Sequence, residues 1–203
     1  LAHIPRKGPV IVVANHPHGL VDGIALANVI GRVRDDYRIL TRSVLTGFDE
    51  EASRFMIPVP FPHDPQAQTK MVEMRRQAMD WLRDGGVIAL FPSGMVATSQ
   101  SMFGPVEEAE WNVFTAKLIR TSGAAVVPLK FEGRNSRSYQ IANRLSATLR
   151  QGLLVHEVVR AQGKPIAPVV GAPVDPAEIA ARIGNARAFM IWLRDLTLAL
   201  RRD

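Results

Sequence analysis

Short runs of apolar, β-branched residues alternate with longer segments of helical periodicity, and this alternation restricts the fold most strongly. Such runs are typical of buried strands. The expected strands are Val10–Ala14, Arg38–Thr41, Val87–Phe91, Ala124–Phe131 and Ile166–Val170. Ile57–Phe61 is also apolar, but Pro58 and Pro60 predict an extended segment there rather than a central strand. Strands that alternate with helices predict an α/β layered domain.

Helices are expected between the strands, and several carry start or stop signals. An aspartate followed by proline favours a helix start, and glycine favours a stop. The predicted helices are Leu20–Arg34, one from Asp64-Pro65 to Gly85-Gly86, Glu108–Ser122, Ser136–Arg160 and a last apolar pattern from Asp175-Pro176 to the chain end.

The composition limits the classes of protein and partner. The 203 residues fit one domain, expected over residues 1–203. Because the chain starts at Leu1 and not at methionine, a preceding segment, a membrane anchor included, stays open. The absence of cysteine excludes disulfides and thiolate metal sites. No run reaches the roughly 18 apolar residues of a spanning helix.

The formal charge of +6 favours anionic partners such as phospholipid headgroups or phosphorylated cofactors. Charge alone does not choose among them. The aromatic content of 6% offers no stacking platform for single-stranded nucleic acid, so nucleic acid is not an expected partner.

The first predicted strand runs into a turn that contains two histidines and an aspartate, Asn15-His16-Pro17-His18-Gly19-Leu20-Val21-Asp22. A strand-to-helix turn can bring the Asp22 carboxylate to a ring nitrogen of His16. The carboxylate would then fix the tautomer and raise the basicity of the other nitrogen, which makes a general base for a hydroxyl group. Spacing alone leaves two alternatives open: a histidine that only caps the turn, and His18 as the partner of Asp22.

This turn resembles the first motif of the glycerolipid acyltransferases, the family of the lysophosphatidic acid acyltransferases. The family pattern is Asn-His, four residues and Asp, whereas five residues separate His16 from Asp22 here. The segment is more similar to a bacterial branch, described as hemolysin-like or lysophospholipid acyltransferase, in which Asn-His-Pro-x-Gly precedes the acid. The resemblance implies that His16 and Asp22 are catalytic and that Asn15 and His18 belong to the substrate site.

A second landmark, Phe91-Pro92-Ser93-Gly94, follows the third predicted strand. It resembles the family's Phe-Pro-Glu-Gly substrate-binding loop, and it implies substrate contacts by Phe91, Pro92, Ser93 and Gly94. Ser93 replaces the glutamate and no arginine follows, which argues against a simple phosphorylated glycerol as the acceptor.

Further landmarks appear in the family's order over residues 8–174. Arg42, after the second strand, resembles a basic substrate contact, although a solvated arginine is an equal alternative. Val126-Val127-Pro128 resembles the fourth family motif, and Gly133-Arg134-Asn135-Ser136 resembles a stretch of the bacterial branch.

The resemblance implies a central mixed, largely parallel sheet flanked by helices, as in glycerol-phosphate acyltransferases. It also implies transfer of a fatty acyl group from acyl-CoA or acyl carrier protein, as co-substrate, to a hydroxyl of a lysophospholipid or related lipid. Neither a metal nor another cofactor is needed. The expected location is peripheral, on the cytoplasmic face of the inner membrane.

A membrane surface is therefore an expected partner. The candidate contact is Ser136–Arg160, in which Arg137, Arg144 and Arg150 surround an apolar stripe of Ile141, Leu145, Leu149 and Leu153. That stripe has an alternative role, because it could instead cover the sheet.

Two other functions compete with this prediction. His16-x-His18 after a strand, with His63 and Asp64, resembles the start of a metal cage in hydrolases. A non-catalytic module that binds lipid surfaces through basic amphipathic helices is the second alternative.

Ser93 is the rival nucleophile, but it lacks the Gly-x-Ser-x-Gly elbow of serine hydrolases. Direct transfer therefore predicts no acyl-enzyme. After incubation with an acyl thioester and no acceptor, intact-protein mass spectrometry should show the unmodified mass. A stable acyl adduct on Ser93 would contradict direct transfer.

Overall fold

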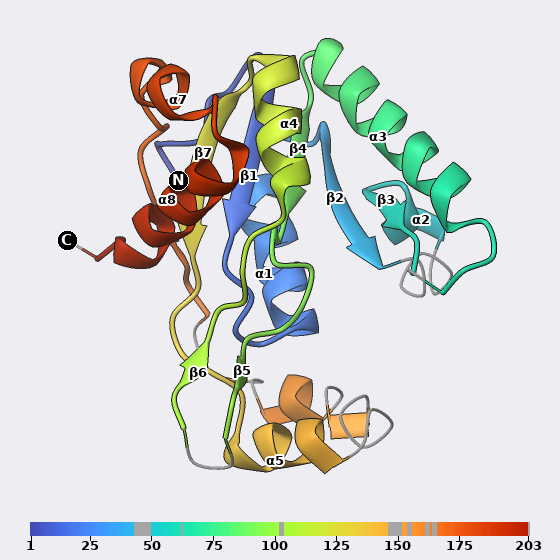
Figure 1. The fold of residues 1–203 in the computed structure, drawn as a ribbon, viewed down its shortest axis with the longest axis vertical. Coiled ribbons are helices and arrows are strands. Elements are labelled where there is room, and N and C mark those ends of the chain that lie inside the picture. Colours follow the sequence, from blue (N-terminus) through green and yellow to red (C-terminus); the bar gives the residue numbers. More distant parts are fainter. Residues whose placement is uncertain are drawn as a thin grey trace.

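A computed structural model describes residues 1–42, 50–61, 63–101, 104–145, 152–153, 156–160, 163 and 166–202. A six-stranded sheet in the order β3-β2-β4-β1-β7-β8 forms its centre. All neighbouring pairs are parallel except β7 and β8, which are antiparallel. The predicted α/β class, with a mixed and largely parallel sheet flanked by helices, is confirmed (Figure 1).

The strands of this sheet are β1 Val10–Ala14, β2 Tyr37–Arg42, β3 Met56–Val59, β4 Val87–Leu90, β7 Ala125–Lys130 and β8 Val169–Val170. A separate antiparallel hairpin consists of β5 Thr98–Ser99 and β6 Val106–Glu107. The helices are α1 Leu20–Gly31, α2 Glu50–Ser53, α3 Ala67–Arg83, α4 Val113–Ser122, α5 Arg137–Leu145, α7 Pro176–Arg182 and α8 Ala186–Ala199.

Alternate residues of β1 enter two separate cores, one on each face of the sheet. Ile11 and Val13 pack with residues of α3, α4 and α8, whereas Val10, Val12 and Ala14 pack on the face covered by α1. All five β1 residues have no exposed surface. This double burial explains why the strand is an unbroken apolar run.

Most predicted elements are confirmed, with shifted ends. The helix predicted over Leu20–Arg34 ends at Gly31, and the strand predicted over Ile166–Val170 is limited to Val169–Val170. The last apolar pattern forms two helices instead of one continuous element, because Asn185 caps α8 by accepting a hydrogen bond from the Ala188 amide. The segment predicted to be extended over Ile57–Phe61, and not a central strand, overlaps β3, which lies at the edge of the sheet.

The helix predicted over Glu108–Ser122 is shorter than expected and begins at Val113. The Asn112 side chain caps it by accepting from the Phe114 amide, at 2.8 Å. Glu107 pairs with Thr98 in the hairpin, so the chain is extended just before Glu108. The prediction was wrong here because long-range pairing with β5 overrides the local helical pattern.

The predicted membrane contact, Ser136–Arg160, is only partly within the described residues. Helix α5 covers Arg137–Leu145, and residues 156–160 are helical. Leu149 and Arg150 lie outside the described residues, as does the side chain of Arg144. Among the helices that the structure describes, none combines the length and apolar character needed to cross a bilayer.

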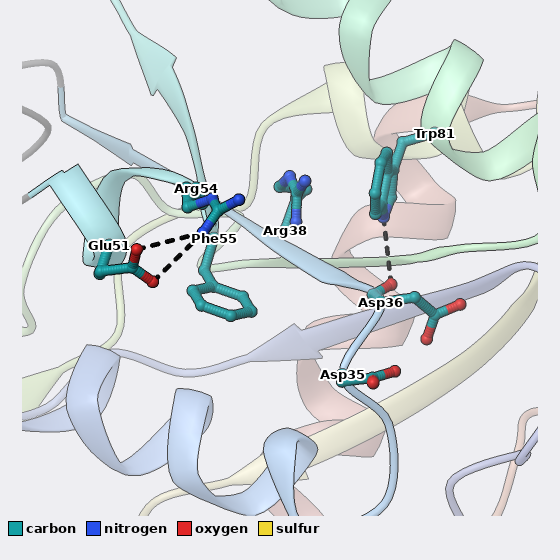
Figure 2. A pocket seen from close by; sticks show the side chains of 7 residues that line it. All are labelled: Asp35, Asp36, Arg38, Glu51, Arg54, Phe55 and Trp81. Carbon is teal, nitrogen blue, oxygen red and sulfur yellow. Dashed lines mark hydrogen bonds and ion pairs between the residues drawn. The ribbon is translucent and has the colours of Figure 1, made fainter.

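Arg34 joins three segments at the amino ends of the strands. Its side chain, 5% exposed, pairs with Asp36 and donates to the carbonyls of Pro5, Gly8 and Gly85. Asp36 belongs to the lining of a cavity of about 390 Å³, where its carbonyl accepts from Trp81 Nε1 at 3.1 Å (Figure 2).

Replacing Arg34 should therefore weaken the fold. We expect Arg34→Met to lower the free energy of unfolding by about 2–4 kcal/mol, because three backbone carbonyls and Asp36 lose their donor and a buried cationic side chain is removed. Urea denaturation measures the change. Arg32→Met, at an exposed arginine bonded to Asn28, is the matched control. Equal denaturation midpoints for the two variants would contradict the proposed stabilising role of Arg34.

Candidate active site

The histidine turn lies at the middle of the sheet's carboxyl edge. β1 is flanked by β4 and β7, and both run parallel to it. Consequently the turn after β1 lies between the chain that follows Leu90 and the chain that follows Lys130. Loops beyond the carboxyl ends of parallel strands form the usual sites of such sheets.

The Asp22 carboxylate is the centre of this turn. Its side chain has no exposed surface, and it accepts four hydrogen bonds from N–H groups. His16 Nδ1 lies 3.1 Å from Oδ2, and His18 Nδ1 lies 2.9 Å from Oδ1. The backbone amides of His18 and Gly19 donate to Oδ2 at 2.7 and 3.1 Å. Both histidines, and not only one, are therefore partners of Asp22.

The environment keeps this carboxylate ionised. Burial by itself raises the pKa of Asp22, but hydrogen bonds from His16 and His18 and their positive charge outweigh it and leave the pKa below 3.8, its ordinary value. An ionised carboxylate only accepts hydrogen bonds, so Nδ1 of each ring is the protonated nitrogen. In the neutral form of each histidine, Nε2 then carries the free lone pair.

The His16 ring is positioned by two contacts, the hydrogen bond of Nδ1 to Asp22 and stacking of the ring face on Phe91. It stacks on Phe91 with a centroid distance of 3.9 Å and an interplanar angle of 19°. No hydrogen-bond partner for His16 Nε2 is found among the described residues. With 17% of the side chain exposed, His16 has the geometry of a base that is oriented on one nitrogen and available on the other.

The His18 ring packs against backbone. A Cβ atom placed on Gly133 would lie 2.9 Å from His18 Nε2, so only glycine fits this contact. Gly133 also has a φ of 96°, which favours glycine. The Gly133-containing stretch singled out in the sequence is thus part of the histidine turn's surroundings.

The Asn15 side chain is bonded to the backbone beyond β7. It is 6% exposed; its Nδ2 donates to the Phe131 carbonyl at 2.9 Å, and its Oδ1 accepts from the Phe131 amide at 2.7 Å. This pair of bonds joins the ends of β1 and β7. The predicted substrate contact by Asn15 stays a prediction.

The structure brings Arg42 to the turn that follows β4. Arg42 Nη2 donates to the Gly94 carbonyl at 3.2 Å, and its guanidinium lies 5.3 Å from the centre of the Phe61 ring. Ser93 Oγ donates to the Met95 carbonyl at 3.0 Å, and Pro92 accepts from the Asn112 amide through its carbonyl. Arg42 and the Phe91–Gly94 segment, far apart in sequence, therefore form one side of the site.

Glu108 reaches the site although its pattern did not single it out. Its Oε2 accepts from the backbone amide of His16 at 3.1 Å, and Oε1 accepts from Trp111 Nε1 at 3.0 Å. It also belongs to the lining of a cleft of about 340 Å³, together with Pro17 and Gly133. A single glutamate in a predicted helix carries no signal that would place it there.

The two cavities differ in position. The cleft of about 340 Å³ borders the histidine turn. The cavity of about 390 Å³ lies near the start of β2 (Figure 2). Arg42, at the other end of that strand, instead contacts Gly94 beside the histidine turn. Arg38, one of the two arginines that line this cavity, stacks on Trp81 with its guanidinium carbon 3.9 Å from the ring centre. The described parts of the chain contain no cluster of three or more His, Asp or Glu side chains placed to hold a metal ion.

Comparisons with known proteins agree with the resemblance seen in the sequence. A family profile described as "Acyltransferase" matches residues 1–201. A protein of Phocaeicola vulgatus named lyso-glycine lipid O-acyltransferase is 30% identical over 183 residues, which cover 86% of this chain and 62% of that protein. A protein of the same name from Bacteroides thetaiotaomicron is 31% identical over 151 residues, covering 70% and 50%. The chain thus matches 50–62% of the length of these relatives.

The lowered pKa of Asp22 predicts how stability depends on pH. The carboxylate's contribution is complete above its ordinary pKa and is lost as the pH falls through the lower pKa of the folded state. We expect Asp22→Asn to lower the free energy of unfolding by about 1–3 kcal/mol at neutral pH. This difference should shrink below about pH 4.

Urea titrations of the wild type and variant, from neutral pH to about pH 3, measure this change. Asp35→Asn, at an exposed aspartate, is the control. A stability difference that grows as the pH falls would contradict the prediction.

Proposed function

The chain belongs to the acyltransferase family, and from this we propose that it transfers a fatty acyl group from a thioester to a hydroxyl of a lipid acceptor, with His16 as general base. The observation that carries the proposal is the hydrogen bond of His16 Nδ1 to the buried, ionised Asp22. It directs the basic Nε2 away from the carboxylate. A base held in this way needs no serine or cysteine nucleophile.

The proposed reaction proceeds by direct attack. His16 Nε2 takes the proton of the acceptor hydroxyl while that oxygen bonds to the thioester carbonyl carbon. Asp22 stabilises the imidazolium that forms. The tetrahedral intermediate then collapses, the carbon–sulfur bond breaks, and the imidazolium returns its proton to the leaving thiolate. The products are the acylated lipid and the free thiol of CoA or acyl carrier protein.

Two contacts favour His16 over His18 as the base. The His16 ring is stacked on Phe91, in the segment that Arg42 also contacts through Gly94. The His18 ring instead has its Nε2 against the backbone at Gly133. His18 is then a second donor that holds the Asp22 carboxylate in place.

The relatives indicate which acceptor to test first. Both are named for O-acylation of a lyso-glycine lipid, so that lipid is the first candidate, and a lysophospholipid is the second. Either acyl-CoA or acyl carrier protein would serve as donor. The net charge of +6 and the partly exposed side chain of Arg42 suit an anionic group on the donor or the acceptor. A peripheral position on the cytoplasmic face of the inner membrane is part of the proposal.

The direct test is an acyl-transfer assay on the purified full-length protein. Radiolabelled acyl-CoA and acyl carrier protein are each offered with lyso-glycine lipid or lysophospholipid, and acylated product is measured by chromatography. Lipidomics of a deletion strain, with complementation, identifies the cellular acceptor. Binding to lipid vesicles without transfer to any acceptor would favour the non-catalytic lipid module instead.

Substitution of the turn residues tests the roles within it. We expect His16→Ala to lower the transfer rate by at least ~100-fold, because the general base is lost. Asp22→Asn should also be severe, because the tautomer and orientation of His16 change. Circular dichroism verifies that each variant is folded. Near-normal turnover by His16→Ala, with no turnover by His18→Ala, would assign the role of general base to His18 instead of His16.

A further inference from the structure

Both backbone polar groups of His16 are bonded to one segment of the chain. The His16 amide donates to Glu108 Oε2 at 3.1 Å, and the His16 carbonyl accepts from the Ala97 amide at 2.8 Å. Ala97 immediately precedes β5, and Glu108 immediately follows β6. The pairing of these two strands therefore determines the separation of the two groups that hold His16.

This segment is itself anchored to the rest of the protein. Trp111, 3% exposed, packs in the core on the α3, α4 and α8 face, and its Nε1 donates to Glu108 Oε1 at 3.0 Å. On the other side of the hairpin, the Ser99 amide donates to Gln140 Oε1 of α5, also at 3.0 Å. The carboxylate that receives the His16 amide is thus tethered to a buried side chain.

We propose that Glu108 is a positioning residue for His16. This inference rests on the proposed function of His16 as a base. Asp22 and Phe91 orient the imidazole ring, whereas Glu108 fixes the backbone from which the ring projects. Hydrogen bonds to a carboxylate are stronger than those between neutral groups, so this contact restrains the turn effectively. A shift of about 1 Å in a reacting group can reduce a rate about 100-fold.

The two oxygens of Glu108 allow a sharp test, because each accepts from a different donor. Glu108→Ala removes both acceptors. Glu108→Gln keeps one acceptor oxygen, so its NH₂ group faces either the Trp111 donor or the His16 amide. In the double variant Glu108→Gln with Trp111→Phe, the competing donor is gone and the oxygen is free for the His16 amide. Trp111→Phe alone is the reference for that double variant.

We expect Glu108→Ala to lower kcat about 10- to 100-fold, with each KM changed less than about threefold. Glu108→Gln should also lower kcat, and the double variant should recover at least about fivefold relative to it. Glu107→Ala, an exposed neighbour that loses the same charge, is the matched control and should keep the wild-type kcat. Wild-type kcat for folded Glu108→Ala, or no recovery in the double variant, would overturn the inference.

Amide hydrogen exchange at His16 provides a readout that does not need turnover. The His16 amide should exchange faster in Glu108→Ala than in the wild type, and slower again in the double variant than in Glu108→Gln. If the wild type transfers no acyl group but these exchange rates change as expected, the proposed function fails while the contact stands. Unchanged exchange at His16 in Glu108→Ala overturns the contact itself.

Discussion

The hydrogen bonds to the buried carboxylate of Asp22 are the interaction on which the site depends. A carboxylate without exposed surface is costly unless its charge is compensated, and here four N–H groups compensate it. Two of them belong to the backbone at the start of α1, where a negative charge is favourable for the helix. The other two belong to the imidazole rings. Formation of the helix and orientation of the candidate base therefore depend on the same group.

The sheet order explains why residues far apart in sequence meet at this group. β1 is flanked by β4 and β7, so the chain after each of these strands borders the histidine turn. Phe91 follows β4 and stacks on His16, and Gly133 follows β7 and accommodates His18. The hairpin β5–β6, between β4 and α4, adds Glu108. A central parallel strand thus gathers contacts from both neighbours, as an edge strand does not.

Sequence patterns predicted the sheet and the histidine turn because these depend on local chemistry. Runs such as Val10–Ala14 are apolar since both faces are buried, and a strand-to-helix turn keeps His16 near Asp22. The position of Glu108 was not predictable from such patterns. It depends on pairing between β5 and β6, which are two residues long and carry no strand signal. Spacing alone also did not predict that His16 and His18 share one carboxylate, because it does not show that the two rings reach different oxygens of Asp22.

The unusual spacing of the motif has a physical explanation in the same turn. His18 lies four residues before Asp22, whereas His16 lies six before it, and both rings reach the carboxylate. Gly19, with a φ of 76°, gives the chain a conformation that other residues rarely adopt, and its amide donates to Oδ2. The residue that is additional to the common family pattern is therefore accommodated within the turn, and His16 Nδ1 still lies 3.1 Å from Asp22 Oδ2. In this chain, five intervening residues are thus compatible with direct contact between the candidate base and Asp22.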